Sequence, residues 1–194
     1  MMLKSVGRAA LLVSFLFGAS WPVYAEPAAA ERETYAPARY GFALLTGSAY
    51  DPDLIGLVLL QGQLLLDYEQ IFWHRAPDDM KIKFELNAGL TLDGRERGVL
   101  SVNMMALRYY ERYALAGATP FVEAGIGLIY TDFRVDGQGL RFNFNPQVGF
   151  GFECPLSSGG ALTTALRLHH LSNSSFYKEN RGVNSALLLI GYLF

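Results

Sequence analysis

The sequence is poor in the residues that build disulfides and metal centres, and it has no strong excess of either charge. It contains one cysteine and three histidines among 194 residues. Cys154 therefore has no partner for a disulfide within the chain. The formal net charge of −2 lacks the basic footprint of nucleic-acid-binding proteins, so we expect no nucleic-acid partner. The sequence contains no metal-ligand cluster, glycine-rich phosphate loop or internal repeat, and we expect neither a metal nor another cofactor.

Long apolar runs are also missing beyond the first 25 residues. Two basic residues precede an apolar run over residues 9–19, and Val23 and Ala25 stand where a signal peptidase reads small residues. We therefore expect a signal peptide over residues 1–25 and a mature barrel domain over residues 26–194. The mature chain has no apolar run of 18 residues, which excludes a membrane-spanning helix. It does not exclude membrane-spanning strands, because each of these needs only about 9–11 residues.

The mature sequence alternates between apolar and polar residues. The clearest example alternates Ile82, Phe84, Leu86, Ala88, Leu90 and Leu92 with Lys81, Lys83, Glu85, Asn87, Gly89 and Thr91. Successive side chains of a strand point to opposite sides, so this pattern predicts a strand with one apolar and one polar face.

Similar stretches account for eight predicted strands. They lie at roughly 38–47, 56–69, 81–92, 99–110, 121–130, 140–153, 161–172 and 184–194. The second of these also carries leucines on its otherwise polar face. Pro146 removes a backbone donor from the sixth strand, and we expect a local irregularity there.

The alternation alone does not decide which face points inward. A soluble, lipocalin-like barrel would turn its apolar face inward, whereas a membrane barrel turns it toward lipid. The apolar faces here are long and rich in leucine and phenylalanine, and the last strand carries Leu188, Ile190, Tyr192 and Phe194 on one face. We therefore predict an all-β, eight-stranded antiparallel transmembrane β-barrel in a bacterial outer membrane, in contact with outer-membrane lipid. Both termini would be periplasmic, and the extracellular connections would lie near 48–54, 93–98, 132–138 and 173–183.

Three polar residues interrupt the predicted lipid-facing wall at its extracellular end. His170 and Ser172 share the apolar face of the seventh strand, about 6.6–7 Å apart along the backbone. Counting back from Phe194 in steps of two places Asn184 on the same wall. Polar groups that face hydrocarbon are costly unless they are paired or functional. A histidine beside a serine makes a candidate base and nucleophile, although interfacial residues at headgroup depth would give the same spacing.

The strings His170-Leu171-Ser172-Asn173 and Asn180-Arg181-Gly182-Val183-Asn184, followed by the apolar terminal strand, resemble the lipid A 3-O-deacylase (PagL-type) family. The resemblance implies a serine hydrolase site with Ser172 as nucleophile and His170 as general base. Asn173 and Ser175 fall at the positions of the family's oxyanion hole. At the position of Ser175 we expect glycine in the family. Asn184 replaces the acid typical of the family. An asparagine can still orient an imidazole, and Glu179 is an alternative orienting residue.

The resemblance predicts an outer-membrane carboxylic ester hydrolase, a serine esterase that removes the 3-O-linked acyl chain of lipid A. Its partner would be lipid A or lipopolysaccharide. Lys178, Asn180 and Arg181 would either contact this substrate or belong to a solvated loop. The alternative is a non-catalytic barrel of the OmpA or OmpX kind, an adhesin or a structural element, in which Ser172 and His170 are dispensable. The oligomeric state stays open, with a homodimer as one alternative.

Overall fold

The computed structural model describes residues 36–194, apart from residues 73, 77 and 78. The expected signal peptide lies outside the described residues. The strands are β1 (Arg39–Asp51), β2 (Ile55–Asp67), β3 (Met80–Thr91), β4 (Gly98–Tyr109), β5 (Thr119–Thr131), β6 (Phe142–Phe144), β7 (Gln147–Pro155), β8 (Ala161–Leu171) and β9 (Val183–Leu193). Two short helices, α2 (Tyr68–Ile71) and the 3-10 helix η1 (Glu111–Tyr113), lie in connections. No helix among the described residues is long and apolar enough to cross a membrane.

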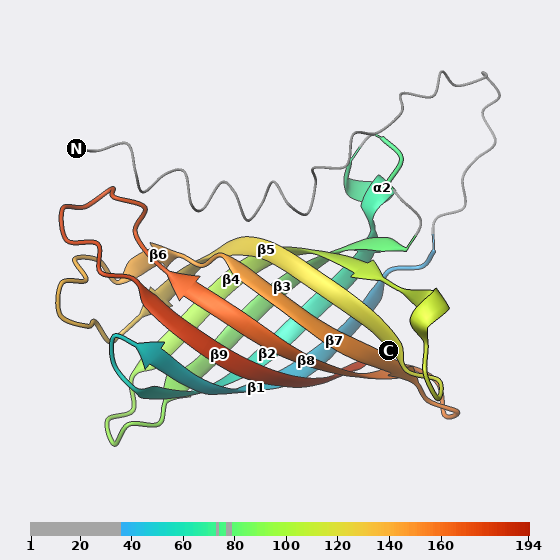
Figure 1. Cartoon of the computed structure of the whole chain (residues 1–194), viewed down its shortest axis with the longest axis horizontal. Coiled ribbons are helices and arrows are strands. Elements are labelled where there is room, and N and C mark those ends of the chain that lie inside the picture. Colours follow the sequence, from blue (N-terminus) through green and yellow to red (C-terminus); the bar gives the residue numbers. More distant parts are fainter. Residues whose placement is uncertain (1–35, 73, 77–78) are drawn as a thin grey trace. The chain divides into compact units, whose positions relative to one another are not determined.

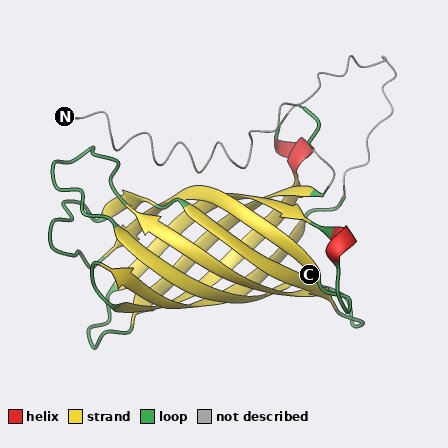
Figure 2. Cartoon of the chain, viewed as in Figure 1, coloured by secondary structure: helices red, strands yellow, loops and turns green. Residues whose placement is uncertain are grey.

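The strands form a closed antiparallel barrel (Figures 1 and 2). Neighbours in sequence pair with one another, and β1 pairs with β9 to close the ring. Because β6 and β7 both pair with β5, they occupy one strand position, and the prediction of eight strands is confirmed. The break between them falls at Asn145 and Pro146, as the missing proline donor predicts.

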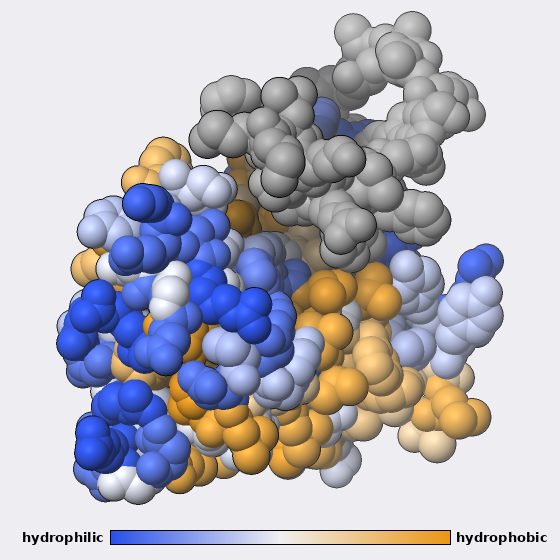
Figure 3. Space-filling model, turned by 60° about the vertical axis from the view of Figure 1, so that its left-hand side comes forward, coloured by the Kyte–Doolittle hydropathy of each residue, from blue (hydrophilic) through white to orange (hydrophobic). Residues whose placement is uncertain are grey.

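The apolar faces of the strands point outward and most polar faces point into the lumen. On β3, Lys83, Glu85 and Asn87 are buried, whereas the alternating Phe84, Leu86 and Leu90 are exposed. Figure 3 shows the resulting apolar wall, with hydrophilic residues gathered at one end of the barrel. The soluble, lipocalin-like alternative is therefore wrong, because it requires the opposite orientation.

The middle of the lumen is filled by a charged network. The Arg167 guanidinium is fully buried and forms ion pairs with Glu85 at 2.9 Å and Glu123 at 2.7 Å. Lys83 bridges the same two carboxylates from the other side, at 3.0 and 2.7 Å. Two cations thus neutralise two anions, which satisfies charges that would otherwise be buried alone.

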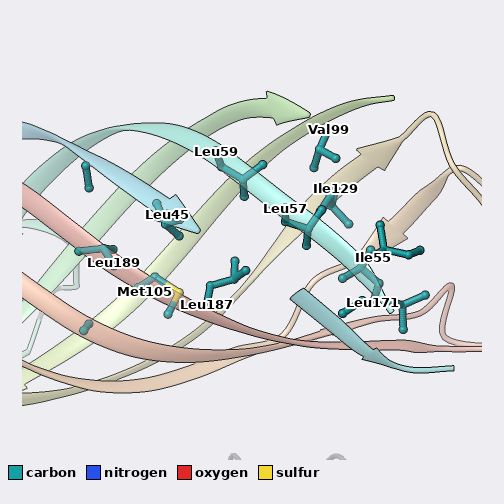
Figure 4. Close-up of a cluster of buried hydrophobic side chains, with 14 of the residues drawn as sticks. Leu45, Ile55, Leu57, Leu59, Val99, Met105, Ile129, Leu171, Leu187 and Leu189 are labelled. Atoms are coloured by element: carbon teal, nitrogen blue, oxygen red, sulfur yellow. The ribbon is translucent and has the colours of Figure 1, made fainter. Parts of the chain in front are cut away.

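A second part of the lumen is apolar (Figure 4). It is lined by inward leucines and other aliphatic side chains, mainly from β1, β2 and β9, including Leu45, Leu57, Leu59, Leu187 and Leu189. These strands therefore carry apolar residues on both faces, although Gln61 and Gln63 of β2 also point into the lumen. The leucines that the sequence places on the polar face of β2 belong to this interior cluster.

The connections divide into two sets at opposite ends of the barrel (Figure 1). One end, which we call the loop end, carries the connections 52–54, 92–97, 132–141 and 172–182. The C terminus lies at the other end, where Tyr40, Phe42, Tyr192 and Phe194 form an outward aromatic cluster with ring centroids 5.0–6.3 Å apart. Aromatic girdles of this kind flank the apolar band of outer-membrane barrels.

Candidate active site

Strands β8, β9 and β1 lie side by side at the loop end and bring three polar residues into one row across the barrel wall. In the strand register, His170 of β8 lies opposite Asn184 of β9, and Asn184 lies opposite Asp51 of β1. The His170 side chain is exposed on the outer wall, while its neighbours His169 and Leu171 are buried inside the barrel. Only one histidine of the pair therefore faces the membrane side.

Hydrogen bonds connect this row from end to end. His170 Nδ1 lies 2.6 Å from Asn184 Oδ1. Asn184 Nδ2 donates to Asp51 Oδ2 at 2.7 Å. Because the amide nitrogen is committed to the carboxylate, the amide oxygen is the acceptor for an Nδ1–H of the imidazole. Nε2 is then the nitrogen that is free to accept a proton, as a general base requires.

Asp51 is the residue of this row that sequence reasoning missed. We expected the first strand to end near residue 47, but it continues to Asp51. A β-bulge between Ala49 and Asp51 shifts the register by one residue. Without that bulge, strict alternation would turn Asp51 toward the lumen, as it does Ala49. The available signal was that the first and last strands of a closed barrel are neighbours, so an acidic residue at the loop end of the first faces the last.

Ser172 follows the last residue of β8 on the same outward side as His170 and is half-buried. Its backbone is held by a bridge to Phe144, with N–H···O distances of 3.1 and 2.8 Å. No hydrogen bond within the described residues joins the Ser172 hydroxyl to the imidazole. Catalytic hydrogen bonds are often long without substrate and tighten in the Michaelis complex.

The backbone at Gly182 leaves room for the imidazole ring of His170. A Cβ atom at this position would lie 2.6 Å from His170 Cε1 and 3.2 Å from Nε2. The ring therefore rests against the backbone of the β8–β9 connection at Gly182. A larger residue here would displace the ring.

Asn173 organises the loop that follows the candidate nucleophile. Its side chain is buried, donates from Nδ2 to the Glu179 carbonyl at 2.8 Å, and accepts from the Ser175 N–H at 3.0 Å. Its own N–H donates to Asn180 Oδ1 at 2.7 Å. The N–H groups of Asn173 and Ser175 thus have acceptors inside the loop, whereas the Ser174 N–H has none among the described residues.

The remaining predicted loop residues have different environments. Arg181 donates to Asp51 Oδ1 at 2.6 Å, and both side chains are partly exposed. Lys178 is exposed and has no partner in the part of the chain that the structure describes. The Glu179 carboxylate makes no hydrogen bond to His170, whereas Asn184 does. Asn180 supports Asn173 rather than reaching outward.

An aromatic surface borders the candidate nucleophile. Phe144, the bridge partner of Ser172, packs against Phe176 with the rings tilted and a centroid separation of 5.8 Å. Phe142 packs on Tyr130 at 5.1 Å. Phe142 and Phe176 remain largely exposed, which leaves apolar surface beside a polar row. Such a surface suits a substrate that carries an acyl chain next to a polar bond.

The fold and the apolar wall define a small β-barrel of the bacterial outer membrane. Two solved structures share this architecture. The outer membrane enzyme PagL has 22% sequence identity and a TM-score of 0.54, over 78% of this chain and 97% of that chain. Neisserial surface protein A (NspA) has 12% identity and a TM-score of 0.58, over 80% of this chain and 94% of that chain. A sequence search among curated proteins found no match.

The family model of lipid A 3-O-deacylase (PagL) matches residues 63–193, about two thirds of the chain. The chain therefore belongs to this family, which makes it an ester hydrolase of the outer membrane. The matched range includes Ser172, His170 and Asn184 but not Asp51.

Proposed function

We propose that this protein removes the 3-O-linked acyl chain of lipid A by a serine esterase mechanism, with Ser172 as nucleophile. The observation that carries the proposal is the row of His170, Asn184 and Asp51, joined by hydrogen bonds on the outer wall beside Ser172. Polar and ionisable residues are rare and costly on a face that otherwise presents leucine and phenylalanine to lipid, and where they occur they mark functional sites. Membership of the lipid A 3-O-deacylase family supports the choice of substrate.

The first chemical step would form an acyl-enzyme. Ser172 Oγ attacks the ester carbonyl carbon while its proton passes to His170 Nε2. The tetrahedral intermediate collapses when the C–O bond to lipid A breaks, and the imidazolium returns the proton to the departing oxygen. Lipid A leaves with a free 3-hydroxyl group.

The second step would release the acyl chain. Water attacks the carbonyl carbon of the acyl-Ser172 ester as His170 takes its proton. The bond from that carbon to Ser172 Oγ then breaks, the imidazolium returns the proton to Oγ, and a 3-hydroxy fatty acid leaves. Donors worth about 2.7–4 kcal/mol each stabilise such oxyanions where they have been measured. The Ser174 N–H is available for this role, whereas the Asn173 amide and the Ser175 N–H would first exchange partners within the loop.

The position of the row supports a substrate that arrives from the membrane. The His170 side chain is exposed on the lipid-facing wall at the loop end, and the exposed rings of Phe142 and Phe176 lie nearby. If the loop end is extracellular, as barrels with longer outer loops suggest, the site meets the leaflet that contains lipopolysaccharide. Lys178 would then be free to pair with a lipid A phosphate.

The test is mass spectrometry of lipid A from a host whose lipid A carries the 3-O-acyl chain. We expect the wild type to remove one hydroxyacyl mass and Ser172→Ala to leave lipid A intact. Ser158→Ala is the matched control, because Ser158 is exposed in the turn after β7, at the opposite end of the barrel, and its side chain makes no hydrogen bond among the described residues. All three proteins must be folded in the outer membrane. Intact lipid A with the wild type would overturn the proposed function and favour a non-catalytic barrel.

A further inference from the structure

We propose that Asp51 is the acidic member of this site and acts on His170 through the Asn184 side chain as a positioning residue. This inference rests on the proposed serine esterase function. Asn184 stands where the related deacylases are expected to carry an acid, and an amide has no charge with which to stabilise an imidazolium. The structure places a carboxylate one hydrogen bond further along the same row, from a strand outside the range that the family model matches.

The Asn184 amide can couple Asp51 to His170 because its nitrogen only donates hydrogen bonds and its oxygen only accepts them. With Nδ2 donating to Asp51, Oδ1 faces His170 and selects the imidazole form that has its proton on Nδ1. A rotated amide would oppose Oδ1 to the carboxylate and offer its NH2 group to Nδ1. That arrangement selects the other tautomer, in which Nε2 carries the proton and cannot accept one from Ser172. In serine proteases, loss of the correct tautomer lowers kcat about 10⁴-fold.

The backbone of β1 is shaped to present this carboxylate. The extra residue between Ala49 and Asp51 turns Asp51 from the lumen side to the outer side, directly beside Asn184. Bulges are over-represented next to active sites, where they re-aim a side chain. Arg181 holds the second carboxylate oxygen, which fixes the plane of the group while Oδ2 remains on the amide. A chain of polarised hydrogen bonds then runs from the carboxylate to the imidazole.

A purely structural role for Asp51 would make different predictions. If Asp51 served only to tie the β8–β9 connection through Arg181, its loss would loosen the loop and leave the imidazole tautomer unchanged. A positioning role requires that the tautomer and kcat change together. It also requires that Asn184→Asp compensate for the loss of Asp51, because the carboxylate at position 184 would then contact His170 directly.

The experiment compares Asp51→Ala, Asp51→Ala with Asn184→Asp, and the control Asp53→Ala in the full-length protein, folded in detergent micelles with lipid A as substrate. Asp53 is exposed and makes no side-chain hydrogen bond or ion pair among the described residues. We expect Asp51→Ala to lower kcat by about ten- to a hundredfold, the range for a hydrogen bond to a charged group, with KM little changed. The double variant should recover most of this loss, and Asp53→Ala should match the wild type.

Nitrogen-15 NMR of the histidine side chains supplies a readout that does not depend on turnover, with His170→Ala to assign the signals. We expect the wild type to carry the neutral-form proton on Nδ1, and Asp51→Ala to shift population to Nε2. An unchanged tautomer, or an unchanged kcat in an active enzyme, overturns the inference. If the wild type leaves lipid A intact but Asp51→Ala still shifts the tautomer, the proposed function is overturned while the positioning role stands.

Discussion

Gly182 gives the sharpest prediction about the site, because one methyl group is enough to move the imidazole. The Cβ of Gly182→Ala would lie 2.6 Å from His170 Cε1, whereas carbon atoms pack comfortably at about 3.5–4.0 Å. The ring must therefore retreat by about 1 Å. A misplacement of that size in a reacting group can cost about 10²-fold in rate. We expect Gly182→Ala to fold normally and to lose deacylation by about that factor.

The assay is the initial rate of 3-hydroxy fatty acid release from lipid A in micelles, with folding judged by heat-modifiable migration in detergent gels. Gly62→Ala is the matched control, since a Cβ there meets nothing within 4 Å. We expect that variant to keep the wild-type rate. A fully folded Gly182→Ala enzyme with undiminished kcat would refute the argument that the imidazole must occupy this position to react.

Two further predictions concern stability and the loop. Arg167→Met should lower the free energy of unfolding by about 3–5 kcal/mol, because it leaves two buried glutamates short of a cation. Arg141→Met removes an exposed ion pair and should lower it by less than about 1 kcal/mol. Unfolding by guanidinium chloride in micelles measures both variants, and equal losses would contradict the buried network. Ser175 has a left-handed φ of 66°, which costs a non-glycine residue about 1–2 kcal/mol. Ser175→Gly should therefore slow proteolysis within the 172–182 loop and preserve kcat, and faster cleavage would disprove this account of the loop.

Most of the fold could be predicted from the sequence because a strand has a period of two and the lipid imposes one apolar face. The break at Pro146 followed from the absence of a single donor. The filling of the lumen could not be predicted in the same way, since Leu57 and Leu187 look like exceptions to the alternation until the closed ring places them in one interior cluster. Periodicity describes one strand at a time, whereas the packing inside a barrel depends on which strands face each other.

The site was predictable to the extent that it depends on one hairpin. His170 and Asn184 are paired by the local register of β8 and β9, and counting in steps of two from Phe194 places both on the outer wall. Asp51 escaped this reasoning because the bulge that exposes it has no clear sequence signal, and because strict alternation gives the opposite side of the wall. One extra backbone residue puts that side chain on the side opposite to the one that alternation alone would give.

The pairing of β1 with β9 determines when the proposed active site is complete. The hairpin of β8 and β9 can bring histidine and asparagine together by itself, but the carboxylate joins them from 133 residues away in sequence. It arrives only when β1 meets β9, the pairing that closes the ring. On the roles proposed above, a chain still in transit has a nucleophile and a base without their acid. Maturation of the hydrolase and completion of its wall are then the same event, which withholds full esterase activity until the protein is assembled.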